Sequence, residues 1–184
     1  MSIGGWLACN QAIRAPARVA SISLLDPAAT LGPRHRPLRQ SLEGLAVPLL
    51  APDPSRYRLD LAYRAKDSLT LSLTSRSDRS ARPQARMEVL VTPVPAGFAP
   101  PGTCLVVQPG PAVNGFEGDA ACRSIGPNRW QRADRDAVQL VERRGAFLVV
   151  VAGHLSGVSL ADLSAVAGSL RPTTARALRA AART

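Results

Sequence analysis

Regular alternation of apolar and polar residues in the middle of the chain constrains the fold of these 184 residues most strongly. Over 58–63 and 69–74, Leu or Tyr stands at every second position, and a turn-like Ala-Lys-Asp-Ser sequence separates the two segments. A period of two residues is typical of strands with one buried face, so these segments are expected to pair as a β-hairpin. The segments 137–141 and 146–151 predict a second hairpin, with Gly145 at its turn.

Two more strands and a long loop are predicted between these hairpins. The segments 87–91 and 103–107 are apolar, and each is followed within two residues by a proline. Proline lacks the N–H that a sheet interior needs, so it ends a strand. Residues 108–129 are rich in Gly, Pro and Asn and are expected to form a loop.

A helix is predicted over 160–169, because Ser159 and Asp162 match a capping box. Leu, Val and Ala recur at helical spacing along it, which gives one apolar face, and Pro172 ends it. Residues 55–170 therefore predict an α+β domain, an antiparallel sheet of about six strands with one C-terminal helix packed on it.

The remaining residues predict three further parts. Residues 1–33 are expected to form a helix followed by a buried strand. Residues 34–54 contain repeated prolines and predict a linker with one short helix at 38–50. Residues 171–184 are basic and are expected to form a solvated C-terminal tail; the helical spacing of Arg176, Arg179 and Arg183 leaves a short basic helix as the alternative.

The N-terminal part begins with Ser-Ile-Gly-Gly-Trp at 2–6, followed by an Ala-containing helical segment, a buried strand and a turn. This order resembles the nucleophile-elbow segment of the α/β-hydrolase family, truncated at its start. The resemblance implies that Ser2 is the nucleophile and that the N–H of Ile3 contributes to an oxyanion hole. In the family's chain order of Ser, Asp and His, the candidates for the other two members of a catalytic triad are Asp26 and His154, although the residues around His154 do not resemble the family's His segment.

The chain differs from the family pattern before the elbow. One residue precedes Ser2, where the family has several strands, and the Gly that opens the elbow motif is absent. His35 lies in a basic turn and His154 follows a predicted strand, so both also fit exposed loop positions. The chain is therefore expected to be a non-catalytic binding or scaffolding domain. The alternative is a serine ester hydrolase that uses Ser2 and His154, with Asp26 or Asp162 as the acid.

A second, weak resemblance covers residues 130–170. Trp-Gln-Arg at 130–132, before a predicted hairpin, and the helix pattern that follows Gly153 look like the end of extracytoplasmic domains of actinobacterial membrane-anchored proteins and lipoproteins. The segment contains no catalytic motif. This resemblance implies no particular ligand.

Three cysteines bear on the compartment and on metal binding. Cys104 and Cys122 bracket the long loop and are the candidate disulfide pair, which would suit an exported domain. Cys9 is expected to pack as a small apolar residue. The Cys and His spacing matches no zinc motif, and the loop carboxylates Glu117 and Asp119 lack the rest of a calcium-binding loop. The sequence therefore predicts no metal and no cofactor.

The formal net charge is +10, and 22 of the 23 basic residues are Arg. A charge of this size attracts polyanions generically, so nonspecific polyanion binding is a second alternative, although no specific nucleic-acid-binding motif is present. No apolar run reaches the roughly 18 residues of a membrane span. The first residues do not match a secretory signal, which predicts a cytoplasmic location for the chain as it stands, or an extracytoplasmic one if the true start lies upstream. The partner is unknown from sequence.

Overall fold

The structure is a computed structural model that describes residues 42–77, 86–105, 119–133 and 137–182. All of them belong to the unit Arg39–Thr184, one of two into which the chain divides. The segment that resembles α/β-hydrolases lies outside these residues.

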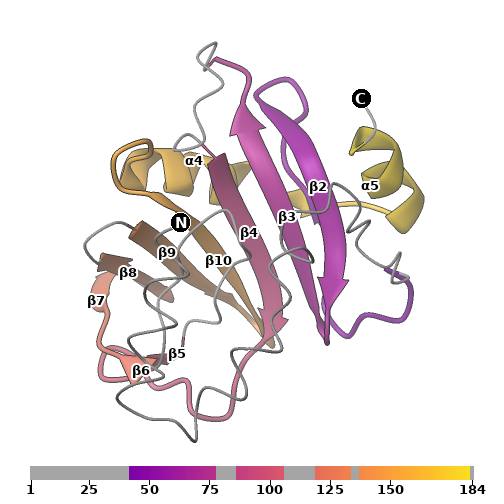
Figure 1. Ribbon diagram of the computed structural model, residues 1–184. Helices are drawn as coiled ribbons and strands as arrows, with labels where there is room; N and C mark the ends of the chain where they lie inside the picture. Colours follow the sequence, from indigo (N-terminus) through magenta and orange to yellow (C-terminus); the bar gives the residue numbers. More distant parts are fainter. Residues whose placement is uncertain (1–41, 78–85, 106–118, 134–136, 183–184) are drawn as a thin grey trace, which may run out of the picture. The chain divides into compact units, whose positions relative to one another are not determined.

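A seven-stranded antiparallel sheet forms the centre of the described domain (Figure 1). Its spatial order is β2-β3-β4-β10-β9-β8-β7, and every neighbouring pair is antiparallel. The strands are β2 (Tyr57–Ala65), β3 (Ser68–Ser75), β4 (Arg86–Pro93), β7 (Arg123–Gly126), β8 (Arg129–Ala133), β9 (Ala137–Arg144) and β10 (Phe147–His154). With the helices below, this is a sheet-rich α+β fold, the class that the sequence predicts.

Two short two-stranded sheets accompany the central one. β1 (Leu50–Ala51) pairs with β11 (Arg171–Pro172), and β5 (Cys104–Leu105) pairs with β6 (Asp119–Ala120). The cysteines of the predicted pair form a disulfide with their Cα atoms 5.8 Å apart. Both are buried among apolar residues on one face of the central sheet.

Both predicted hairpins are present. The β2–β3 hairpin turns at Lys66, whose φ of 54° is in the left-handed region, and the β9–β10 hairpin turns at Gly145, with φ of 65°. Glycine accepts this conformation without the steric cost of a Cβ atom. The alternating leucines of β3 all point to one face, where they lie opposite Met87, Val89 and Val91 of β4.

The two edge strands, β2 and β7, depart from regular pairing. The register shifts between Leu59 and Leu61 on β2 and between Ser124 and Gly126 on β7. Each edge of the sheet therefore has a bulge or irregularity within the strand.

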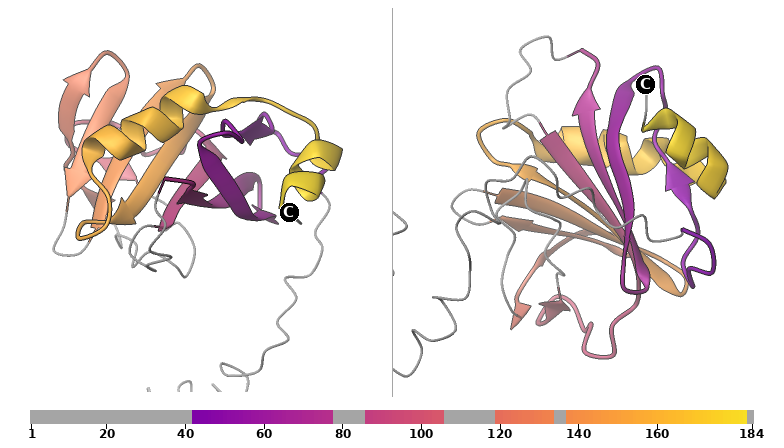
Figure 2. Two further views of the ribbon diagram at one scale, coloured as in Figure 1. Left: turned by 90° about the horizontal axis from the view of Figure 1, so that it is seen from above. Right: turned by 45° about the vertical axis from the view of Figure 1, so that its right-hand side comes forward.

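Helix α4 (Leu160–Ser169) lies across β9 and β10, and helix α5 (Ala175–Ala181) lies beside β2 (Figure 2). The predicted capping box is present: Ser159 Oγ accepts from the Asp162 N–H at 3.2 Å, and Asp162 Oδ2 accepts from the Ser159 N–H at 2.8 Å. Thr174 caps α5. Each cap satisfies backbone donors that have no partner within the helix.

The main core lies between the sheet and the two helices. Its sheet side consists of alternate residues of the central strands, so one apolar face follows directly from the two-residue period. The buried members include Leu69, Leu71, Leu73, Met87, Val89, Val91, Leu140, Val149 and Val151, together with Leu163 and Val166 of α4 and Leu178 of α5.

Gly153 allows the chain to turn from β10 towards α4 at close range. A Cβ atom at this position would lie 2.2 Å from Cγ2 of Val158. The side chain of Val158 is buried in the main core, so it has little room to move away. The position therefore requires glycine for space.

The central sheet has more strands than predicted because part of the segment 108–129, which the sequence predicts to be a loop, is strand. β7 lies in that segment, and β8 follows it directly. Both strands are short and rich in polar residues, so they lack the apolar period that identifies a strand in sequence. Of the expected strand at 103–107, the described residues include Cys104–Leu105, which pair with β6 outside the central sheet.

The segments beside the predicted domain are also more structured than expected. In place of a short helix, the described residues 42–50 form turns that end in β1; Gly44 has a φ of 71°, and Pro48 cannot donate a helical hydrogen bond. The expected solvated tail instead supplies β11 and α5, and Leu178 is completely buried. The buried Leu178 and the Thr174 cap stabilise this helix, which the helical spacing of the arginines offered as the alternative to a solvated tail.

Candidate functional site

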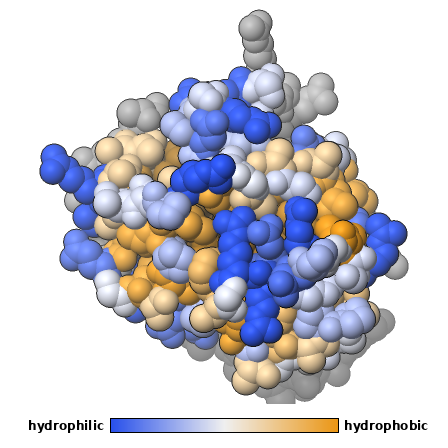
Figure 3. Space-filling model, turned by 180° about the vertical axis from the view of Figure 1, so that it is seen from behind, coloured by the Kyte–Doolittle hydropathy of each residue, from blue (hydrophilic) through white to orange (hydrophobic). Residues whose placement is uncertain are grey.

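A groove lies on the helix-bearing side, between the start of β2, the C-terminal half of α4, and α5. It consists of two hollows of about 800 and 600 Å³. Both hollows are lined by Arg56, Tyr57, Arg76 and Ala165, so they meet at these residues. Figure 3 shows this side of the molecule, where hydrophilic side chains lie directly beside apolar surface.

Arg56 and Arg76, which we call the arginine pair, stand where the two hollows meet. Arg56 precedes β2 and Arg76 follows β3, and the Arg76 N–H donates to the Arg56 carbonyl oxygen at 2.8 Å. The two side chains therefore start from opposed positions of the hairpin. Like charges opposite each other on paired strands are destabilising. Two like charges that stay close together where two hollows meet are a candidate site for an anionic ligand.

Contacts within the chain hold both guanidinium groups. Arg76 Nε donates to the Pro54 carbonyl oxygen at 2.8 Å, and the Arg56 guanidinium carbon lies 5.6 Å from the centroid of the Tyr57 ring. Within the described ranges, the Nη atoms of the pair make no hydrogen bond and no carboxylate is ion-paired with either residue. These planar donors suit a carboxylate or phosphate group.

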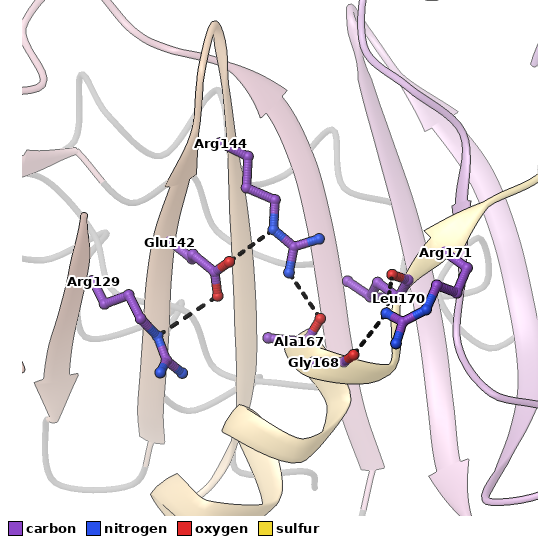
Figure 4. Close-up of polar contacts among 7 residues, drawn as sticks. All are labelled: Arg129, Glu142, Arg144, Ala167, Gly168, Leu170 and Arg171. Carbon is purple, nitrogen blue, oxygen red and sulfur yellow. Dashed lines mark hydrogen bonds and ion pairs between the residues drawn. The ribbon is translucent and has the colours of Figure 1, made fainter. Parts of the chain in front are cut away.

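A third arginine, Arg171, lines the larger hollow and fixes the end of α4 (Figure 4). Its Nη1 donates to the carbonyl oxygens of Gly168 and Leu170, at 2.8 and 2.9 Å. Arg144 Nη2 donates at 2.8 Å to the Ala167 carbonyl oxygen, which also accepts from the Leu170 N–H at 3.3 Å. The last carbonyls of a helix have no partner within it and attract cations, so the two arginines hold the α4 wall of the groove in place.

Next to that helix end lies a glutamate-centred cluster, formed by Glu142, Arg144 and Arg129 (Figure 4). Glu142 Oε1 lies 2.8 Å from Arg144 Nε, and Glu142 Oε2 lies 3.6 Å from Arg129 Nε. One carboxylate thus faces two guanidinium groups on adjacent strands. Cross-strand pairs of opposite charge stabilise a sheet, so this cluster has a structural explanation.

Two carboxylates line the groove, and both are engaged within the chain. Asp53 Oδ1 accepts from the hydroxyl and the N–H of Ser55 at 2.7 and 2.9 Å. These two hydrogen bonds, and then the charges of Arg56 and Arg171, lower the pKa of Asp53. Asp162 is engaged in the α4 capping box, and its hydrogen bonds with Ser159 lower its pKa. Neither carboxylate neutralises the arginine pair by direct contact.

The opposite face of the sheet carries a buried polar row. Strand pairing aligns Arg132, Gln139, Ala152, Glu88 and Ser72 across five strands. Gln139 is completely buried, and its amide atoms have no hydrogen-bond partner among the described residues. Burial, and then the Glu88 carboxylate, raise the pKa of Tyr63 beside this row. Since Glu88 is 3% exposed, a dissolved ligand reaches the groove more readily than this row.

Of the predicted catalytic residues, the structure describes Asp162, the alternative acid, which is engaged in the α4 capping box, and His154, at the end of β10. Its Nδ1 lies 2.8 Å from Ser156 Oγ and accepts from the Ser156 N–H at 3.3 Å. Outside the described residues lie Ser2, Ile3, Asp26, His35, Cys9 and Glu117. The hydrolase triad therefore stays a prediction.

No group of three or more His, Cys, Asp or Glu side chains among the described residues could hold a metal ion. The described helices include none that is long and apolar enough to cross a membrane.

Comparison with protein-family models, with curated proteins and with solved structures found no match for this chain. Function is therefore argued from the groove itself.

The arginine pair was not identified from the sequence. The even spread of 22 arginines hides which of them lie together. Regular pairing counted outward from the turn of the first predicted hairpin would place Arg56 opposite Ser77. The register shift between Leu59 and Leu61 places it opposite Arg76 instead, and no pattern in the sequence indicates that shift.

Proposed function

We propose that the described domain is a non-catalytic binding module that takes up an anionic ligand in the groove. The observation that supports this proposal is the arginine pair: two opposed guanidinium groups, held by Pro54 and Tyr57, with no carboxylate paired to them in the described part of the chain. A bound anion offsets the repulsion between the two charges and accepts hydrogen bonds from their Nη atoms.

The experiment is an NMR titration of the full chain with inorganic phosphate at low salt. Substituting Arg56→Gln or Arg76→Gln is expected to weaken binding about tenfold or more, because a hydrogen bond to a charged group contributes about 1.5–3 kcal/mol. Arg58→Gln is the matched control, because it removes an equal charge two residues further along the chain. Arg58 is ion-paired with Asp60 at 2.7 Å and does not line the groove.

Equal weakening by all three substitutions would count against the groove. It would favour generic attraction by the net charge, the polyanion-binding alternative, which also predicts a steep loss of affinity with salt.

The serine ester hydrolase remains the alternative that the first 33 residues suggest by resemblance. It predicts covalent labelling by a fluorophosphonate that Ser2→Ala removes, and ester turnover that His154→Ala abolishes. Absence of labelling on Ser2 would exclude it.

A further inference from the structure

We infer that the ligand of this groove is an amphiphilic anion, with its charged head at the arginine pair and its apolar chain in the larger hollow. This inference rests on the proposed function and adds the class of ligand. It follows from the different chemistry of the two hollows on either side of the same two guanidinium groups.

The larger hollow has the more apolar walls of the two, although Asp53, Ser169, Arg171 and Thr173 also line it. Beyond the arginine pair it is lined by residues that include Ala51, Pro52, Leu59, Pro172, Ala177 and Ala181. Its volume of about 800 Å³ falls within the roughly 300–1,000 Å³ typical of small-molecule sites. An apolar chain that leaves water for this hollow gains free energy in proportion to the area buried.

The smaller hollow is richer in hydroxyl groups. Ser55, Ser75 and Ser77 line it together with Asp162. Ser75 Oγ and Ser77 Oγ lie 2.8 Å apart; Ser75 is the last residue of β3, and Ser77 follows it on the other side of Arg76. A ligand that spans the junction therefore meets polar partners on one side of the arginine pair and apolar walls on the other.

Asp53 restricts where the charged head can lie. Its carboxylate belongs to the larger hollow and is close enough to Arg56 and Arg171 for their charges to lower its pKa. A second anion near Arg171 would meet this carboxylate. The smaller hollow has its own carboxylate, Asp162, which is engaged in the α4 capping box, so the charged head is placed at the arginine pair itself, where the two hollows meet.

An extended acidic peptide fits the larger hollow less well. Its main chain brings an N–H and a carbonyl group with nearly every residue, and each loses free energy when it leaves water without a partner. Two backbone acceptors in the walls are already occupied, because the Pro54 carbonyl accepts from Arg76 and the Gly168 carbonyl accepts from Arg171. Hydrocarbon needs no such partner.

The experiment measures binding of the full chain to inorganic phosphate and to butyl, octyl and dodecyl phosphate, each below its micelle concentration. The affinity is expected to rise with chain length by up to about fourfold per methylene until the hollow is full, the factor that corresponds to about 0.8 kcal/mol. Ala177→Asp places a charge in the larger hollow. It is expected to abolish the dependence of the affinity on chain length.

Ala180→Asp is the matched control, since Ala180 is an exposed residue of the same helix that does not line the groove. It is expected to leave the dependence on chain length unchanged. Two outcomes would overturn the amphiphilic ligand and leave the proposed function standing. One is an affinity that does not change with chain length but still requires Arg56 and Arg76. The other is tighter binding of an acidic peptide than of dodecyl phosphate. Phosphate and alkyl phosphates that bind regardless of Arg56→Gln and Arg76→Gln would overturn both.

Discussion

The glutamate-centred cluster and the arginine pair present the same side chain in opposite situations. In the cluster, Glu142 lies within 2.8 Å of Arg144 and 3.6 Å of Arg129, so the positive charges are offset inside the protein. Between Arg56 and Arg76, the described residues provide no carboxylate partner. The cluster therefore stabilises the fold, whereas the pair is available to something outside it. An arginine becomes a candidate for binding when it lines a groove and has no ion-pair partner, whereas the number of arginines by itself indicates nothing.

The largest effect is expected from displacing α4, because both regions contact this helix: Arg144 of the cluster binds its Ala167 carbonyl, and the groove is lined by its C-terminal half. Gly153→Ala forces Cβ against Val158 at the entry to this helix, so it should lower the free energy of unfolding by about 1–3 kcal/mol and weaken phosphate binding as well. Urea unfolding and the phosphate titration measure the two effects.

Gly168→Ala is the control for this substitution. A Cβ atom there meets nothing within 4 Å, and Gly168 lies inside α4, so stability should be unchanged or rise by up to about 1 kcal/mol. If both substitutions cost the same, the close approach at Gly153 is not the cause.

A second prediction separates the two regions directly. Glu142→Gln leaves two partly buried guanidinium groups without their shared carboxylate and should destabilise the fold by about 1–2 kcal/mol, less than a fully buried pair because these side chains are partly exposed. Arg56→Gln should change stability by less than about 0.5 kcal/mol while it weakens phosphate binding. Urea unfolding of both variants is the measurement. A large loss of stability in Arg56→Gln would mean that the pair is structural, and the comparison would fail.

The smallest expected effect concerns the capping box at the other end of α4. Hydrogen bonds from Ser159 lower the pKa of Asp162 in the folded state below its ordinary 3.8, so the ionised form stabilises the fold. This contribution is fully present well above pH 3.8 and is lost as the pH falls through the lowered folded value.

Asp162→Asn should therefore reduce stability at pH 7 by less than about 1 kcal/mol, and the difference from the unaltered protein should shrink towards pH 3. Unfolding in urea at the two pH values tests this. Asp67→Asn removes an equal charge from an exposed turn and should show a smaller difference at pH 7. A pH-independent loss in Asp162→Asn would contradict the assigned cause.

The sequence predicted the parts of the fold that depend on local periodicity. Leucines at every second position of β3, and a Ser-x-x-Asp start before an apolar helical face, each specify one element and its buried side. The polar strands β7 and β8 lack such a period. Their place in the sheet depends on tertiary pairing, of β8 with β9 and of β7 with β8. Helix α5 depends on the burial of Leu178, a tertiary contact that no local pattern reports.

The groove was still less accessible to sequence reasoning. It combines residues from the start of β2, the end of β3, α4, β11 and α5, which come together only after the sheet has formed. The resemblance to α/β-hydrolases predicts Ser2 as the nucleophile, and Ser2 lies outside the described residues. In contrast, the arginine pair belongs to no motif and is defined by strand pairing.

The irregular edges of the sheet have a consequence for how this domain can meet other molecules. An extra strand can join a sheet only where a long run of N–H and carbonyl groups stays in step, and the shifts at Leu59/Leu61 and Ser124/Gly126 interrupt that run on both sides. Growth of the sheet into polymers of itself is thereby discouraged. Other molecules are then recognised through side chains, and a single substitution can change the affinity without changing the backbone.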